Sequence, residues 1–129
     1  MKSLDTNVVL RALIVDDDEQ AATALAAMSG PAYLTPTVLL ETAWVLGSVA
    51  KLARDQIASN LSDILAMPNV VIAQRDNVRW AVDRYAAGAD FADMLHLALS
   101  GGSDCFATFD QGVARFSDAS QIPVETLRP

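Results

Sequence analysis

The stretch "AYLTPTVLLETAWVLGSVA", residues 32–50, predicts how the chain is built. The segment "AYLT" is short and apolar, which is typical of a buried strand. Thr35 followed by Pro36 is typical of a helix start, because threonine is a good N-cap and proline fits the first helical position. A strand that leads directly into an apolar helix is the basic unit of an α/β protein with a parallel sheet.

One residue of this helix does not fit an apolar face. Helical spacing gives Glu41 four neighbours on its own face, which are Thr37, Val38, Trp44 and Val45. This surface resembles core, and a buried ionised carboxylate without a partner is strongly unfavourable. We therefore expect Glu41 to be protonated, paired with a cation, or less buried than its neighbours suggest.

The remaining segments repeat the alternation of strands and helices. Further short strands are expected at residues 2–4, 69–73, 104–109 and 122–127. Further helices are expected at residues 5–15, 19–29, 54–67, 76–87, 90–100 and 110–116. This order predicts one α/β domain over residues 1–129, with a parallel sheet of short strands covered by helices on both faces.

Composition narrows the class of protein. The 129 residues are 52% hydrophobic, yet no apolar run approaches the roughly 18 residues that span a bilayer. The start "MKSLDTNVVL" does not resemble a secretory signal, and the only cysteine is Cys105, so we expect a cytoplasmic protein. A net charge of −7 argues against binding nucleic acid through a basic surface alone. It is compatible with an enzyme whose metal ions carry the positive charge.

Acidic residues follow several of the expected strands. Asp5 comes directly after the first strand and Asp110 directly after "CFATF", while Glu41 lies in the second turn of the helix after the second strand. Ligands of such folds bind at the carboxyl ends of the strands, so these three acids are expected on one rim. Asp90 and Asp93 share a face at the start of an apolar helix, whose place on that rim the sequence leaves open.

These acids allow a structural and a catalytic interpretation. Aspartate is a preferred N-cap, so Asp5, Asp90 and Asp110 could each only cap a helix, and the helix dipole would favour Asp93. Carboxylates that converge on one rim, however, repel one another unless a cation lies among them. Mg²⁺ and Mn²⁺ prefer such oxygen ligands, whereas one histidine and one cysteine cannot supply a usual zinc site.

Four segments of the chain resemble a known family. "LDTNVVLRAL", "LLETAWVL", "GADFADMLHLAL" and "FATFDQGVARF" are similar, in order and approximate spacing, to motifs of the PIN-domain ribonucleases, most closely the VapC-type toxins of VapBC toxin–antitoxin pairs. The resemblance covers nearly the whole chain, and one departure is the first strand, where "MKSL" is more polar than usual. It implies a compact three-layer α/β/α fold, a homodimer, RNA as substrate and an antitoxin protein as inhibitor.

The resemblance also implies a set of site residues. Carried over by position, the catalytic acids that bind Mg²⁺ or Mn²⁺ are Asp5, Glu41, Asp93 and Asp110. Accessory positions match Asp90, Thr108 and Asn7. Apart from the resemblance, Arg11 and Arg115 could contact RNA, or each could be an ordinary solvated arginine. The chemistry agrees, because phosphodiester hydrolysis needs an activated water and stabilised charge, both of which a metal supplies. Whether one or two metal ions bind is left open.

Two other functions fit parts of the sequence. The run "ALIVDDDEQ" resembles the acidic pocket of a receiver domain, which would make the chain a phosphorylation switch. Such a switch needs a later lysine, and none follows Lys51, so the run around Asp16–Glu19 is better interpreted as a solvated loop. The other alternative is a PIN-like binding module without catalysis, which metal titration would distinguish from an enzyme.

Overall fold

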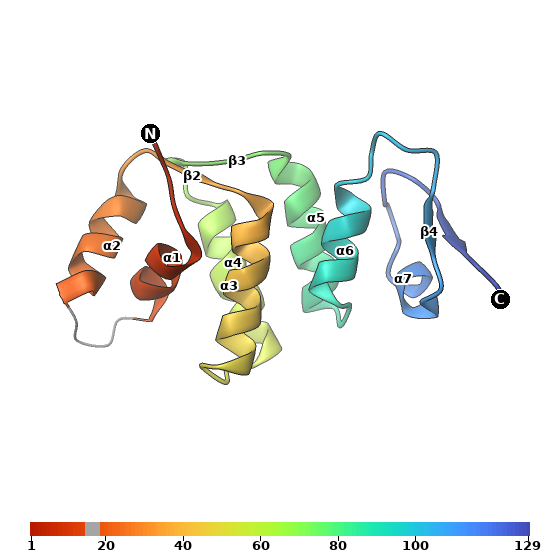
Figure 1. Cartoon of the computed structure of the whole chain (residues 1–129), viewed down its shortest axis with the longest axis horizontal. Helices are drawn as coiled ribbons and strands as arrows, with labels where there is room; N and C mark the ends of the chain where they lie inside the picture. The colour runs from red at the N-terminus through yellow and green to blue at the C-terminus, as the bar shows by residue number, and fades with distance from the viewer. Residues whose placement is uncertain (15–18) are drawn as a thin grey trace. The chain divides into compact units, whose positions relative to one another are not determined.

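The computed structural model describes residues 1–14 and 19–129, which form two compact units. The first unit is Met1–Arg75 and the second is Asp76–Pro129 (Figure 1). Most of the acidic run expected to form a solvated loop lies outside the described residues, as does the end of the first expected helix.

The first unit is built on a three-stranded parallel sheet in the order β1-β2-β3. Its strands are β1 (Lys2–Ser3), β2 (Ala32–Leu34) and β3 (Val70–Ile72). Its helices are α1 (Thr6–Leu13), α2 (Glu19–Ser29), α3 (Pro36–Ser48) and α4 (Arg54–Leu65). Helix α1 packs against α2 and α3, and α3 also packs against α4. In register, Lys2 pairs with Ala32 and Ala32 with Val70, so the three strands end at the same edge.

The second unit holds a two-stranded parallel sheet, in which β4 (Phe106–Thr108) pairs with β5 (Val124–Thr126). Its helices are α5 (Arg75–Ala86), α6 (Phe91–Ala98) and α7 (Gln111–Arg115). Helix α5 ends before Gly88, whose φ of +121° suits glycine. The expected strands and helices are therefore confirmed within a few residues, and every strand pair described is parallel.

Each unit has an apolar core contributed by one face of its helices. In the second unit, Val78, Ala81 and Val82 of α5 are buried, as their spacing predicts. Tyr85, on the same face, places its ring 5.5 Å from the ring of Phe91 at the start of α6. None of the helices in residues 1–14 and 19–129 is long and apolar enough to cross a membrane.

Helix α3 buries a different face from the one its sequence suggests. Thr35 caps the helix as expected, with its hydroxyl accepting a hydrogen bond from the Val38 amide at 3.3 Å. The buried side chains of the helix are Leu39, Thr42, Ala43 and Leu46. Glu41 is on the opposite side and exposed, and Trp44 is 66% exposed. Of the three alternatives for Glu41, the structure supports the one in which its side chain is less buried than its neighbours suggest. An almost wholly apolar helix does not reveal from its sequence which face it buries.

Candidate catalytic site

Asp5 lies between β1 and α1, directly before the first residue of α1. Its side chain caps α1 by accepting a hydrogen bond from the Thr6 amide, with a nitrogen–oxygen distance of 2.8 Å. The Asp5 side chain is exposed, whereas the preceding Leu4 is buried in the core of the first unit. The capping interpretation of Asp5 is therefore confirmed, and its exposed position leaves carboxylate oxygen accessible for a second role.

Glu41 is joined to the start of α1 by a side-chain hydrogen bond. The hydroxyl of Thr6 donates to Oε1 of Glu41, although the two residues are 35 positions apart in the sequence. Thr6 itself is only 5% exposed, so its hydroxyl is fixed in the packed part of the unit. Parallel pairing of β1 with β2 puts the first turns of α1 and α3 at the same edge of the sheet. Asp5 and Glu41 thus share the rim that the sequence predicts.

The second unit places three further acids at helix starts. Asp90 caps α6 by accepting a hydrogen bond from the Asp93 amide at 2.9 Å. Asp110 caps α7 by accepting one from the Gly112 amide at 2.7 Å. The Asp110 amide in turn donates to the hydroxyl of Thr108 at 3.0 Å, which fixes the turn after β4. The predicted capping roles of Asp90 and Asp110 are confirmed.

Among the Asp and Glu residues that the structure describes, Asp93 is the one whose pKa is clearly shifted. Partial burial raises the pKa of its carboxyl above the ordinary value, and the negative charges of Asp90 and Asp110 raise it further. A side-chain hydrogen bond with Asp110 also favours the protonated form, while His96 acts in the opposite direction. The charges of Asp90 and Asp110 therefore oppose the ionisation of Asp93, an effect that a bound cation would relieve.

The donor chemistry of both groups of acids fits a hard divalent cation. Every candidate ligand offers carboxylate oxygen, which Mg²⁺ and Mn²⁺ prefer. Among residues 1–14 and 19–129, however, no three His, Cys, Asp or Glu side chains are gathered as a set that could hold a metal ion. Neither unit by itself therefore presents a complete metal site in the part of the chain described.

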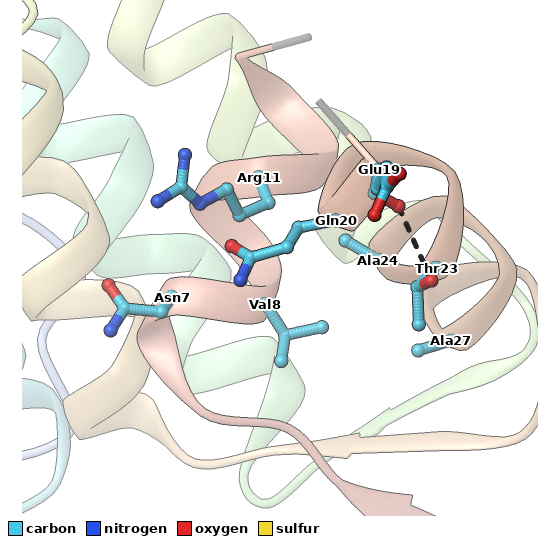
Figure 2. A pocket seen from close by; sticks show the side chains of 8 residues that line it. All are labelled: Asn7, Val8, Arg11, Glu19, Gln20, Thr23, Ala24 and Ala27. Atoms are coloured by element: carbon cyan, nitrogen blue, oxygen red, sulfur yellow. Dashed lines mark hydrogen bonds between the residues drawn. The ribbon is translucent and has the colours of Figure 1, made fainter. Parts of the chain in front are cut away.

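The other residues singled out from the sequence lie on α1 and α7. Asn7 and Arg11 are on α1, and both line a cavity of about 500 Å³ between α1 and α2 (Figure 2). Arg115 is exposed in the last turn of α7. Sequence reasoning missed the contributions of Thr6 and His96. The only signals were their positions, since Thr6 directly follows Asp5 and His96 lies one helical turn after Asp93.

Comparison with known proteins places the chain in a family. The model of the PIN domain matches residues 2–119, which include most of both units. A comparison with curated proteins finds no match. The family match agrees with the predicted three-layer α/β/α PIN-like fold and argues against the receiver-type alternative. Because the match covers far more than half of the sequence, the chain belongs to the PIN-domain family.

Proposed function

We propose that this chain is a Mg²⁺- or Mn²⁺-dependent endoribonuclease that acts in the cytoplasm as the toxin of a type II toxin–antitoxin pair. PIN domains are generally metal-dependent nucleases, which supports the reaction class. The observation that carries the proposal is the crowding around Asp93, whose carboxyl is flanked by the negative charges of Asp90 and Asp110. Such crowding opposes ionisation, and a cation bound beside Asp93 would relieve it.

In this proposal residues 1–129 act as one catalytic domain, and four acids hold the metal: Asp5, Glu41, Asp93 and Asp110. When bound, the metal would activate water and stabilise charge on the phosphoryl oxygens. The protein's own contribution is orientation. Thr6 orients the carboxylate of Glu41 through a hydrogen bond. Asp90 caps the first turn of α6, which contains Asp93, and the hydroxyl of Thr108 fixes the turn that carries Asp110.

The partners follow from charge and from the resemblance to VapC-type toxins. Asn7 is an accessory residue of the site, and Arg11 and Arg115 contact RNA phosphates, for which guanidinium is well suited. A net charge of −7 favours a cationic inhibitor, so an antitoxin would place a basic side chain among the carboxylates in competition with the metal. The active protein is a homodimer in this proposal.

Cleavage of RNA with controlled metal content tests the proposed function. The purified chain should cut an RNA pool in Mg²⁺ or Mn²⁺ and lose that activity in EDTA. Asp93→Asn, purified in parallel, should be inactive, which separates the chain's own activity from a contaminating nuclease. Sequencing the new RNA ends identifies the substrate. Equal cleavage in EDTA and in Mg²⁺ would contradict the metal mechanism, and RNA binding without cleavage would favour a non-catalytic module.

A further inference from the structure

The second unit contains a cavity, the β4–β5 cavity, at the end of its two-stranded sheet. Its volume is about 760 Å³, and it is lined by Phe109, Gln111, Thr126, Leu127, Arg128 and Pro129. The amide of Leu127 donates to the carbonyl of Thr108 at 2.7 Å, so the two strands end side by side. Ligands of parallel sheets bind at the carboxyl ends of the strands. The cavity is therefore at the edge where a ligand is expected.

Phe109 gives the cavity an exposed aromatic face. Its side chain is 69% exposed, whereas Phe91 is buried and Phe106 and Phe116 are half-buried. Within Asp76–Pro129, all of which the structure describes, Phe109 is the one large hydrophobic side chain that is exposed. A single exposed ring is common on protein surfaces, but this ring lines a cavity together with hydrogen-bonding side chains. Proteins use such rings to stack the bases of single-stranded nucleic acid.

The polar side chains of the cavity favour an anionic ligand over a basic peptide. Gln111 offers an amide and Thr126 a hydroxyl, each of which can donate and accept. Arg128 is exposed and is the only charged side chain among the described residues that line the cavity. Glu125 does not line it, and its carboxylate lies 3.6 Å from Sγ of Cys105. A guanidinium attracts phosphate and repels basic side chains.

The cavity adjoins one of the candidate metal ligands. Asp110 lies between Phe109 and Gln111 in the sequence, and both of these neighbours line the cavity. The Asp110 carboxylate accepts a hydrogen bond from the Gly112 amide, and the Asp110 amide donates to the hydroxyl of Thr108. These two bonds fix the turn that follows β4. A base held against Phe109 would therefore bring its own phosphates to the turn that carries Asp110.

We propose that the β4–β5 cavity holds one nucleotide of a single-stranded RNA substrate, with its base stacked on Phe109 and an adjoining phosphate paired with Arg128. The inference rests on the proposed ribonuclease function. A cavity of about 760 Å³ has room for a nucleotide. Stacking accepts every base, since each has a flat face, so the cavity holds the RNA beside Asp110 without selecting a sequence.

Substitutions of Phe109 test the stacked base without requiring cleavage. Binding of a labelled random-sequence single-stranded RNA is measured by fluorescence anisotropy in Mg²⁺, with Asp93→Asn present in every protein so that the RNA stays intact. Phe109→Ala and Phe109→Leu should each weaken binding by about tenfold, the scale of losing one stacked base, whereas Phe109→Trp should bind at least as tightly. Because Phe109 is exposed, none of these changes should lower the melting temperature.

A strand without bases provides the matched control. Abasic RNA of the same length retains the riboses and phosphates but has no base to stack, so Phe109→Ala should not change its affinity. Arg128→Gln should weaken the binding of both strands and lower the slope of log affinity against log salt by about 0.7, the value for one phosphate contact. Arg79→Gln, which changes an exposed arginine of α5 outside the cavity, should bind both strands as before.

The outcomes separate this inference from the proposed function. If wild type cleaves RNA no better than Asp93→Asn does, the proposed function fails and with it the inference. If wild type cleaves and Asp93→Asn does not, but Phe109→Ala leaves RNA affinity unchanged, the inference alone is wrong, and this is the result expected of a cavity that accepts a segment of a partner protein. Equal losses of affinity for intact and abasic RNA would also overturn it, because Phe109 would then not stack a base.

Discussion

The two units hold their acids in different ways. In the first unit, Glu41 is exposed and accepts a hydrogen bond from the hydroxyl of Thr6, a neutral donor fixed in the core. In the second unit, Asp93 is partly buried and crowded by two further acids, which raises its pKa. A neutral donor can orient a carboxylate without opposing its charge, whereas neighbouring carboxylates disfavour that charge. The first unit therefore presents an oriented carboxylate and the second a carboxylate whose ionisation is opposed.

The largest expected effects come from removing one charge in either unit. If both carboxylate groups serve one reaction, Glu41→Gln and Asp93→Asn should each lower RNA cleavage at least about a hundredfold, as expected for the loss of one electrostatic contact to the transition state. Asp63→Asn, which changes an exposed acid of α4, provides the control and should cleave as wild type does. If only one of the two variants lost RNA cleavage, the acids of the two units would not be equivalent in function.

The next effect concerns the orientation of Glu41. Thr6→Val keeps the shape of the side chain and removes the hydroxyl, so it should weaken Mn²⁺ binding by about tenfold, a typical effect of losing a residue that orients a metal ligand. Calorimetric titration with Mn²⁺ measures this without an RNA substrate. Thr6→Ser retains a hydroxyl and should restore most of the affinity. Equal Mn²⁺ affinity for wild type and Thr6→Val would assign the hydrogen bond to folding alone.

A smaller effect is expected at Asp90, which caps α6. Asp90→Asn should lower the rate of RNA cleavage by less than about tenfold, because asparagine is an equally good cap and keeps the first turn of the helix in place. Asp90→Ala removes the cap and should in addition lower the free energy of unfolding by about 1 kcal/mol. Cleavage rates and thermal melts of both variants separate the two roles. A loss at Asp90→Asn as large as at Asp93→Asn would make Asp90 a metal ligand.

Much of the fold was predictable because its signals are local. Thr35 and Pro36 predicted the start of α3, and the apolar spacing of α5 predicted its buried face. The buried face of α3 was not predictable, since its sequence is apolar on nearly every side and only tertiary packing selects Leu39 and Leu46 over Trp44. The bond from Thr6 to Glu41 spans 35 positions in the sequence, so no local pattern indicates it.

The positions of the candidate acids were predictable for a related reason. Asp5, Asp90 and Asp110 each occur where an apolar element begins or ends, so capping and a place on the rim follow from the same pattern. The difference between the two units was not predictable, because it depends on which side chains approach one another. The perturbed pKa of Asp93 depends on burial and on Asp110, which is 17 positions later in the sequence.

The smallest expected effect is a gain of stability in the second unit when no metal is bound. The pKa of Asp93 is raised in the folded protein above its ordinary value of 3.8, so the folded state binds the proton more tightly than the unfolded chain does. The ionisation of Asp93 therefore does not destabilise the folded protein well below pH 3.8. It lowers the free energy of unfolding increasingly as the pH rises through the ordinary pKa of 3.8 and then through the raised pKa of the folded state. Asp93→Asn removes an ionisation that folding opposes. In EDTA, the variant should melt at a higher temperature than wild type at pH 7, and this difference should diminish as the pH is lowered toward 3.

Glu41→Gln provides the contrast for this measurement, because Glu41 accepts a hydrogen bond from Thr6 and lies in the other unit. The amide oxygen of glutamine can still accept that bond, but more weakly than a carboxylate, so we expect no gain of stability in EDTA at pH 7. Adding Mn²⁺ should stabilise wild type by an amount that grows with RT ln(1 + [L]/Kd) and should stabilise Asp93→Asn less. If Asp93→Asn and Glu41→Gln shift the melting temperature in EDTA by the same amount and in the same direction, the crowding around Asp93 has no energetic consequence, and the contrast between an oriented carboxylate and one whose ionisation is opposed must be abandoned.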